Sequence, residues 1–314
     1  MPPMPTPPIA RFILGLILLL PVRVLATDNV AQITHGQQRI TIDYPASFTE
    51  TERRTTHRWL QTVTTALLTV YGELPKDHFR IHIERAAGHA GPVPWGQVKR
   101  HAPTEVLLVI HPEQGYDALL ADWTAFHEMS HLLLPYRGYG NVWLSEGLAS
   151  YYQNIIQARS GRFDAMEMWR RIVAGFERGK QQQRWQQLTL TEVSDRMRET
   201  RQFMRIHWSG VLYWLTADVT LRRDHDTTLD QALKQLKACC EESDMSAEEI
   251  VQKLDELTGA SVFTSLFHQF GESKTMPDYI PLLDELGVIA NSTDDVTYND
   301  DSPLADIRMQ IEPR

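Results

Sequence analysis

The chain has little cysteine. Its 314 residues include two cysteines, Cys239 and Cys240, and these are adjacent. Consecutive Cα atoms lie about 3.8 Å apart, below the usual disulfide range of about 4.4 to 6.8 Å, so a bridge between them would be strained. The pair also lacks the spacing of a redox or metal-binding motif. We therefore expect two residues at a helix end, with stability coming from a hydrophobic core.

The chain also lacks any concentration of positive charge. The formal net charge is −9, and basic residues form only short pairs such as Arg53-Arg54. A protein that binds nucleic acid usually carries a basic patch or stripe. Nucleic acid is therefore not expected as a partner.

Long apolar runs are missing except near the N-terminus. The run Phe12–Leu20 is shorter than the roughly 20 residues that span a bilayer. Arg11 precedes it and Val24-Leu25-Ala26 follows it, as in a signal peptide with a small-residue cleavage site. We expect residues 1–26 to be a signal peptide and the protein to be exported, to a bacterial periplasm or as a secreted protein. The alternative is an uncleaved membrane anchor, which would be the only contact with a membrane.

Two short segments carry the chemistry: His127-Glu128-Met129-Ser130-His131, and Trp143-Leu144-Ser145-Glu146-Gly147. On a helix, residues four apart are separated by about 400° of rotation, so the two imidazoles face one metal ion. Catalytic zinc takes three protein ligands and keeps one position for water, and two histidines with one glutamate are an established set. We predict a Zn²⁺ site on His127, His131 and Glu146, with Glu128 as the base that accepts a proton from water.

The surroundings of the motif favour a metal site over a solvated polar helix. Apolar residues at helical spacing place the motif on a helix within residues 116–134, and Pro135 and Gly138 end it. A second helix that starts near Trp143 would carry Glu146 back to the metal. Because apolar side chains surround these polar groups, the groups need partners, and a metal supplies one.

These residues resemble the gluzincin metallopeptidases. In that family H-E-x-x-H is followed by W-L-x-E-G-x-A, and residues 123–152 fit this pattern. Residues 207–236 look like the later helices of the glycyl-aminopeptidase-like branch, and the resemblance covers roughly residues 105 to 285. It implies a zinc-dependent peptidase with a thermolysin-like core, related also to the aminopeptidase N catalytic domain.

The chain departs from the family pattern at two places. Where relatives place a tyrosine that stabilises the oxyanion, this chain has His207, either a hydrogen-bond donor to that oxyanion or a partly solvated polar residue. Tyr213 is a weaker candidate for the role. Where many gluzincins have an acid that orients a ligand histidine, this chain has Ser150, and Asn141, Asp122 or a backbone carbonyl would have to substitute.

The expected fold class is α+β, with a thermolysin-like zincin core. Strands are predicted near residues 39–44, 79–84 and 105–111, a helix over 51–71, and an edge strand near 95–99 by resemblance. Residues 27–112 would form an N-terminal α/β part, residues 113–290 a helical zinc-binding part, and residues 291–314 a polar C-terminal tail, with residues 291–301 mobile or a solvated loop. The helical part would include helices near 163–177, 210–221, 229–238, 247–257 and 262–270.

The predicted function is hydrolysis of peptide bonds in a peptide or protein substrate, by a zinc-activated water with a glutamate general base. Endopeptidase and aminopeptidase action both stay open, because the G-x-M-E-N signature of the aminopeptidase N relatives is absent. The alternative is a catalytically inactive, exported zinc-binding interaction or assembly factor. Intact Glu128 favours the enzyme, whereas closure of the site by a fourth protein ligand would favour the alternative.

Overall fold

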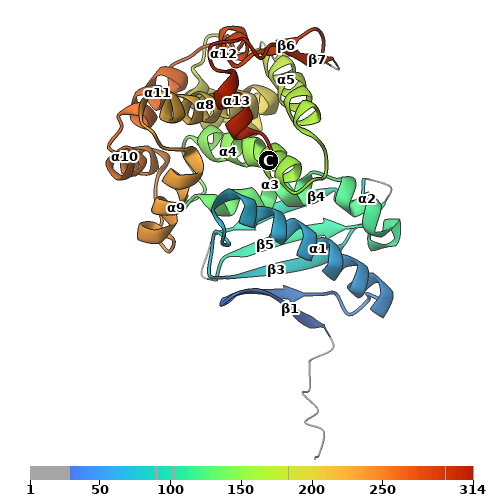
Figure 1. Ribbon diagram of the computed structural model, residues 1–314. Helices are drawn as coiled ribbons and strands as arrows, with labels where there is room; N and C mark the ends of the chain where they lie inside the picture. The colour runs from blue at the N-terminus through green and yellow to red at the C-terminus, as the bar shows by residue number, and fades with distance from the viewer. Residues whose placement is uncertain (1–28, 89–90, 101–102, 183, 294, 314) are drawn as a thin grey trace, which may run out of the picture.

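The computed structural model describes residues 29–88, 91–100, 103–182, 184–293 and 295–313 (Figure 1). The predicted signal peptide, residues 1–26, lies outside these ranges. An N-terminal sheet with one long helix forms one half, and helices form the other half. Within the described ranges, no helix is long and apolar enough to cross a membrane.

A five-stranded mixed sheet makes up the N-terminal half, in the order β1-β2-β3-β5-β4. The strands are β1 (Val30–His35), β2 (Gln38–Asp43), β3 (His78–Arg85), β4 (Trp95–Lys99) and β5 (Glu105–Ile110). Strands β2, β3 and β5 run parallel, and β4 pairs with β5 in antiparallel fashion. The edge strand predicted at residues 95–99 is therefore present, and it is the edge strand that contacts helix α3 of the site.

The long helix α1 (Glu50–Tyr71) lies across this sheet (Figure 1). Thr49 caps its first turn in a capping box with Glu52, which satisfies backbone N–H groups that would otherwise lack partners. At the other end Gly72 has φ 86°, a left-handed conformation that glycine adopts without steric cost. The predicted helix over residues 51–71 and its end at Gly72 match the structure.

Helices make up the C-terminal half. The elements in order are η1 (Pro112–Gln114), α2 (Gly115–Ala121), α3 (Thr124–Ser130), η2 (His131–Leu133), α4 (Val142–Arg159), α5 (Ala165–Gln181), α6 (Leu190–Asp195), α7 (Met197–Thr200), α8 (Phe203–Asp224), α9 (Leu229–Cys240), α10 (Ala247–Thr258), α11 (Val262–Gly271), α12 (Ile280–Leu286), β6 (Val288–Ala290), β7 (Val296–Tyr298) and α13 (Ala305–Ile311).

The closest helix packing in this half joins α4 and α8 through two glycines. A Cβ added to Gly147 would lie 2.3 Å from the carbonyl carbon of Gly210, and a Cβ on Gly210 would lie 2.3 Å from the carbonyl oxygen of Trp143. Only glycine leaves room for backbones at this separation. The contact brings two site residues together, because Glu146 precedes the first glycine and His207 lies three residues before the second.

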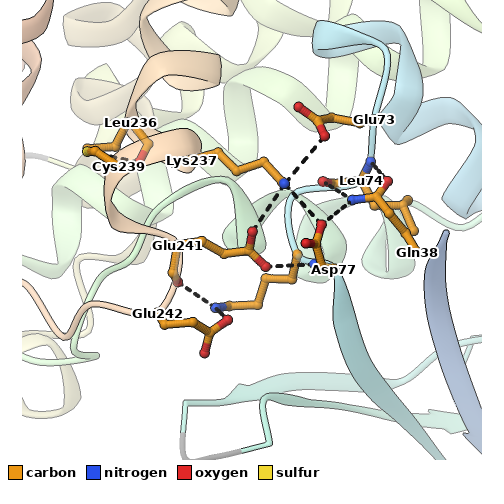
Figure 2. Close-up of polar contacts among 10 residues, drawn as sticks. Gln38, Glu73, Leu74, Asp77, Leu236, Lys237, Cys239, Glu241 and Glu242 are labelled. Carbon is orange, nitrogen blue, oxygen red and sulfur yellow. Dashed lines mark hydrogen bonds and ion pairs between the residues drawn. The ribbon is translucent and has the colours of Figure 1, made fainter.

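A cluster of charged residues around Lys237 links α9 to the loop between α1 and β3 (Figure 2). The Lys237 ammonium is largely buried and lies 3.4 Å from Glu73, 3.1 Å from Asp77 and 3.1 Å from Glu241. The Asp77 backbone N–H also donates to the Glu241 carboxylate, at 2.6 Å. These contacts attach the helical half to the sheet on the side of α9.

Three expectations need correction. The helix expected over residues 116–134 is interrupted, because α2 ends at Ala121 and α3 begins at Thr124, whose N–H is capped by the Asp122 carboxylate at 2.8 Å. The zinc motif therefore lies on the short helix α3 and the 3₁₀ turn η2 that follows. His131 still donates its N–H to the carbonyl of His127, so the four-residue spacing keeps its helical geometry.

The segment expected to be a solvated polar tail is folded. Strand β7 pairs with β6, and in α13 the side chains of Ile307 and Ile311 are buried. Their spacing of four residues gives the last helix an apolar face. The average composition of residues 291–314 does not show this face, because acidic residues precede the helix. The Trp169 indole also donates to the Glu312 carboxylate at 2.8 Å, which attaches the segment to α5.

The two adjacent cysteines form a disulfide, whereas we expected none. Cys239 and Cys240 are bonded at the end of α9, with their Cα atoms 3.7 Å apart. The expectation rested on the usual Cα separation, which does not apply to neighbours whose separation is fixed by the peptide bond.

Candidate active site and metal centre

Three helical segments bring the predicted metal ligands together. The Nε2 atoms of His127 on α3 and His131 at the start of η2 lie 3.2 Å and 3.5 Å from the same carboxylate oxygen of Glu146 on α4. The two rings are perpendicular, with centroids 4.8 Å apart. Both histidines are buried, and the Glu146 side chain is 21 % exposed. The three residues predicted as metal ligands therefore share one site.

The side chain of His207 on α8 also lies next to this group. Its Nε2 atom lies 3.5 Å from the Glu146 carboxylate, the same distance as the Nε2 atom of His131. Its ring stacks on that of His127, with centroids 5.7 Å apart. His127, Glu146 and His207 offer ligand atoms that all lie within 4.8 Å of one another. The His207 imidazole therefore lies beside Glu146 and His127, with its side chain 19 % exposed.

The outer nitrogen of each imidazole has a fixed partner. His127 Nδ1 lies 2.9 Å from the Gln153 amide oxygen, His131 Nδ1 lies 3.0 Å from the Ser145 hydroxyl, and His207 Nδ1 lies 3.2 Å from the Ser150 hydroxyl. The amide oxygen of Gln153 can only accept, so His127 donates to it from Nδ1, and in the neutral imidazole this leaves Nε2 free to bind a metal. Such contacts orient metal-binding histidines, and the donor set therefore fits a metal ion.

The partners suggested from the sequence for this orienting role lie elsewhere. The Asn141 amide oxygen accepts from the Trp143 indole and from Thr191, and Asp122 caps α3. Ser150, which replaces the family's acid, contacts His207 instead of a motif histidine. Gln153 and Ser145 went unrecognised because Ser145 occupies the variable position of W-L-x-E-G-x-A and Gln153 lies outside that pattern. Gln153 lies seven residues after Glu146 on α4, and that spacing was the available signal.

Charges in the site favour an ionised carboxylate. Burial alone would raise the pKa of Glu146, but His131 and a hydrogen bond from His127 hold that pKa well below its usual value. For His127, burial acts to lower the pKa, but Glu146 and Glu128 outweigh it and raise the value. Burial lowers the pKa of His207 to about 4, so this imidazole is neutral at neutral pH.

The predicted base, Glu128, lies between α3 and the edge strand β4. A Cβ built on Gly96 of β4 would lie 2.4 Å from Cγ of Glu128 and 3.0 Å from its Cδ. The side chain is partly buried, and no described residue forms a hydrogen bond with its carboxylate. The missing side chain of Gly96 provides the room that the Glu128 side chain occupies.

Arg100 is a half-buried cation that stabilises the end of the segment carrying the motif histidines. Arg100, directly after β4, donates to the backbone carbonyls of Leu134 and His131 at 3.1 Å and 3.2 Å, and to the Ser145 hydroxyl at 3.4 Å. Burial lowers the pKa of this guanidinium to about 10, which leaves it charged at neutral pH. Its contact with Ser145 uses one acceptor lone pair of that hydroxyl, whose own proton stays available to a neighbour. Tyr213, the weaker candidate, is buried and donates to the Phe263 carbonyl at 3.0 Å, so it belongs to the core.

Parts of the sequence and the overall fold are similar to those of known peptidases. The family model of the M61 glycyl aminopeptidases matches residues 137–213. An aminopeptidase N family protein from Idiomarina loihiensis has a similar structure, with a TM-score of 0.60 and 16% identity over 83% of this chain and 49% of that one. The match is therefore to one stretch of the sequence and to the overall fold of that protein. An M1 zinc metallopeptidase from Deinococcus radiodurans is also similar, at 18% identity and a TM-score of 0.45, over 80% of this chain and 52% of that chain.

The predicted family resemblance and the α+β fold class are thereby confirmed. No curated protein sequence matches the chain. The chain spans about half the length of the solved structures named above. The family model covers α4 to the middle of α8, which is the stretch that carries Glu146 and His207.

Proposed function

We propose that this protein is a zinc-dependent peptidase. The observation that supports the proposal most directly is the convergence of His127 and His131 on the carboxylate of Glu146, with the outer nitrogens of both imidazoles held by Gln153 and Ser145. Two imidazoles and one carboxylate form an established ligand set for catalytic zinc. When bound, zinc would supply a Lewis acid that lowers the pKa of a coordinated water to about 7.

The remaining roles belong to residues of the chain. Glu128 accepts a proton from the attacking water and delivers it to the leaving nitrogen of the peptide. His207 is neutral, and its Nε2 faces the same side of the site as the ligands. If the Ser150 hydroxyl donates to Nδ1, Nε2 carries the proton and donates to the oxyanion that develops on the substrate carbonyl. The edge strand β4 would bind an extended peptide substrate by strand addition.

The site of action is proposed from the sequence. The apolar run Phe12–Leu20 and the following Val24-Leu25-Ala26 support export, with the mature chain starting near Thr27. N-terminal sequencing of the protein from separated cell fractions tests this. A mature N-terminus outside the cytoplasm is expected, and a full-length chain retained in the membrane would favour the anchor.

The test of catalysis compares metal content with hydrolysis of casein and of a pooled peptide library. Glu128→Gln should keep about one zinc per chain and lose turnover, because the amide cannot accept the proton. Glu248→Gln, an exposed glutamate in α10, is the matched control and should behave like the wild type. If Glu128→Gln hydrolysed peptides at the wild-type rate, the assignment of the base would be wrong.

One observation favours a second candidate, a closed zinc site in a protein that binds partners without cleaving them. His207 Nε2 is as close to Glu146 as the predicted ligand His131 is. If the proton of His207 lies on Nδ1 and is donated to Ser150, the bare Nε2 supplies a fourth protein ligand, as in structural zinc sites.

Substituting His207 separates the two candidates. In the peptidase, His207→Ala removes an oxyanion donor and should lower kcat about 10²- to 10³-fold with zinc affinity kept. In the closed site, the same change should weaken zinc binding and open a coordination position. The absorption spectrum of the cobalt-substituted protein, with and without added azide, distinguishes them, because azide changes the spectrum only where a position is open.

A further inference from the structure

A cavity of about 430 Å³ adjoins the metal centre. His207, Ser150 and Gln153 form the wall shared with the centre, so this cavity begins where the outer nitrogens of the ligand cluster are held. Trp123 and Trp208 supply apolar surface. A group placed in this cavity would belong to a substrate residue close to the scissile bond.

Arginines form the wall of the cavity opposite the metal centre. Arg170, Arg171 and Arg178 on α5 all line it, and no aspartate or glutamate is among the described residues that do. Arg171 and Arg178, seven residues apart, lie on one face of α5, and Arg170 lies next to that face. Glu167 engages the first two, with Arg170 Nε at 2.5 Å and Arg171 Nε at 2.6 Å, so these two guanidinium groups are held in place from outside the cavity.

Arg178 is the cation available to a ligand. Its guanidinium carbon lies 5.2 Å from the ring centroid of Trp208, which positions the group over the aromatic face. Among the described residues, no carboxylate pairs with it. Its neighbour Glu177 instead binds the Tyr279 hydroxyl and lies 4.0 Å from Lys180. Burial lowers the pKa of Arg178, and no nearby acid acts to raise it.

We propose that this cavity is a specificity pocket for a substrate carboxylate, bound by Arg178 beside the proposed scissile bond. A planar guanidinium binds a carboxylate through two parallel hydrogen bonds, and Arg170 and Arg171 add positive potential from the same helix. The carboxylate comes either from an acidic side chain or from the C-terminus of the peptide. A positively charged N-terminal amine finds no acidic partner among the described lining residues. The proposal names a substrate class for the peptidase and therefore rests on the proposed function.

The test uses three short peptides with a free amine and otherwise identical sequence. One carries a glutamate side chain and a C-terminal amide, one carries glutamine and a free C-terminal carboxylate, and one carries glutamine and an amide. Binding is measured by calorimetry on the zinc-loaded Glu128→Gln protein, and hydrolysis is measured on the wild type. We expect one of the carboxylate peptides to bind at least tenfold more tightly than the neutral peptide, and the tighter one identifies the source of the carboxylate.

Arg178→Gln should abolish this preference, with a loss of about 10- to 100-fold for the carboxylate peptide and no change for the neutral one. Arg198→Gln, an exposed arginine on α7, is the matched control and should keep the preference. The preference should also shrink as salt is raised, because the cavity is open to solvent ions.

The outcomes separate this proposal from the proposed function. Carboxylate-selective binding that depends on Arg178, without hydrolysis by the wild type, would support the pocket and refute the peptidase. Hydrolysis that is equal for all three peptides would support the peptidase and overturn the pocket. A preference that survives Arg178→Gln, or the absence of binding by any peptide, would also overturn the pocket.

Discussion

Gly96 offers a way to move the proposed base without touching a metal ligand. Strand β4 passes so close to α3 that an alanine Cβ at this position would lie 2.4 Å from Cγ of Glu128 and 3.0 Å from Cγ2 of Thr124. Ordinary van der Waals contact begins at about 3.4 Å. The Glu128 side chain would therefore have to retreat by about 1 Å, or β4 would have to shift outward by a similar distance.

We expect Gly96→Ala to lower kcat/KM by about 100-fold, because a misplacement of about 1 Å in a reacting group costs roughly that factor. This corresponds to about 2.7 kcal/mol of transition-state stabilisation. Overpacking should lower the free energy of unfolding by about 1–3 kcal/mol. Zinc content should stay near one per chain, because His127, His131 and Glu146 lie on α3, η2 and α4 and do not contact the added methyl group. The assays are peptide hydrolysis, zinc analysis and urea unfolding.

Gly91→Ala is the matched control for this substitution. It adds the same methyl group to the segment before β4, where the nearest atom is an Asp122 carboxylate oxygen at an ordinary 3.8 Å. The control should keep wild-type activity. Full activity in a folded, zinc-loaded Gly96→Ala protein would refute the position that we assign to the base. Loss of zinc together with activity would show that the change acts through the metal centre instead.

Two further predictions concern the packing of α4 on α8 and the contact between the helical half and the sheet. Gly210→Ala places a Cβ 2.3 Å from the Trp143 carbonyl oxygen, a backbone atom that cannot move by itself, so it should cost at least about 3 kcal/mol in urea unfolding and weaken zinc binding as α4 and α8 separate. Lys237→Met should cost about 1–2 kcal/mol, since it removes charge-assisted contacts to Asp77 and Glu241. Hydrogen bonds from Gln38 and Lys237 lower the pKa of Asp77, so stability from this carboxylate is present above its usual pKa of 3.8 and is lost as pH falls. The stability difference between Lys237→Met and the wild type should therefore shrink below about pH 4, and an unchanged difference would contradict the role of Asp77.

The sequence predicted those features that local spacing determines. The four-residue spacing of His127 and His131 fixes their common face, and the second helix returns Glu146 to them. Strands β2, β3 and β5 and helix α1 follow from the pattern of apolar residues, and the end of α1 follows from Gly72. These features depend on residues close together in the chain, so a pattern in one sequence is enough to find them.

Other features depend on contacts between distant residues. Whether His207 reached the metal centre was open, because its position depends on how closely α8 packs on α4. The orienting partners Gln153 and Ser145 are ordinary polar residues, and only the ring directions in the folded protein select them. The folded C-terminal segment was missed for a related reason: its composition is polar, and the isoleucines of α13 gain meaning only from the surface on which they pack.

The glycine pair connects these two groups of features. In the sequence, Gly147 is one position of the W-L-x-E-G-x-A pattern. In the structure, Gly147 and Gly210 together set the distance between the backbones of α4 and α8. That distance places residue 207 within reach of the metal centre whatever its side chain is. A tyrosine there could donate only through its hydroxyl, whereas the imidazole of His207 donates or ligates according to which nitrogen carries the proton. The choice between an open and a closed centre in this chain therefore depends on one proton between His207 and Ser150.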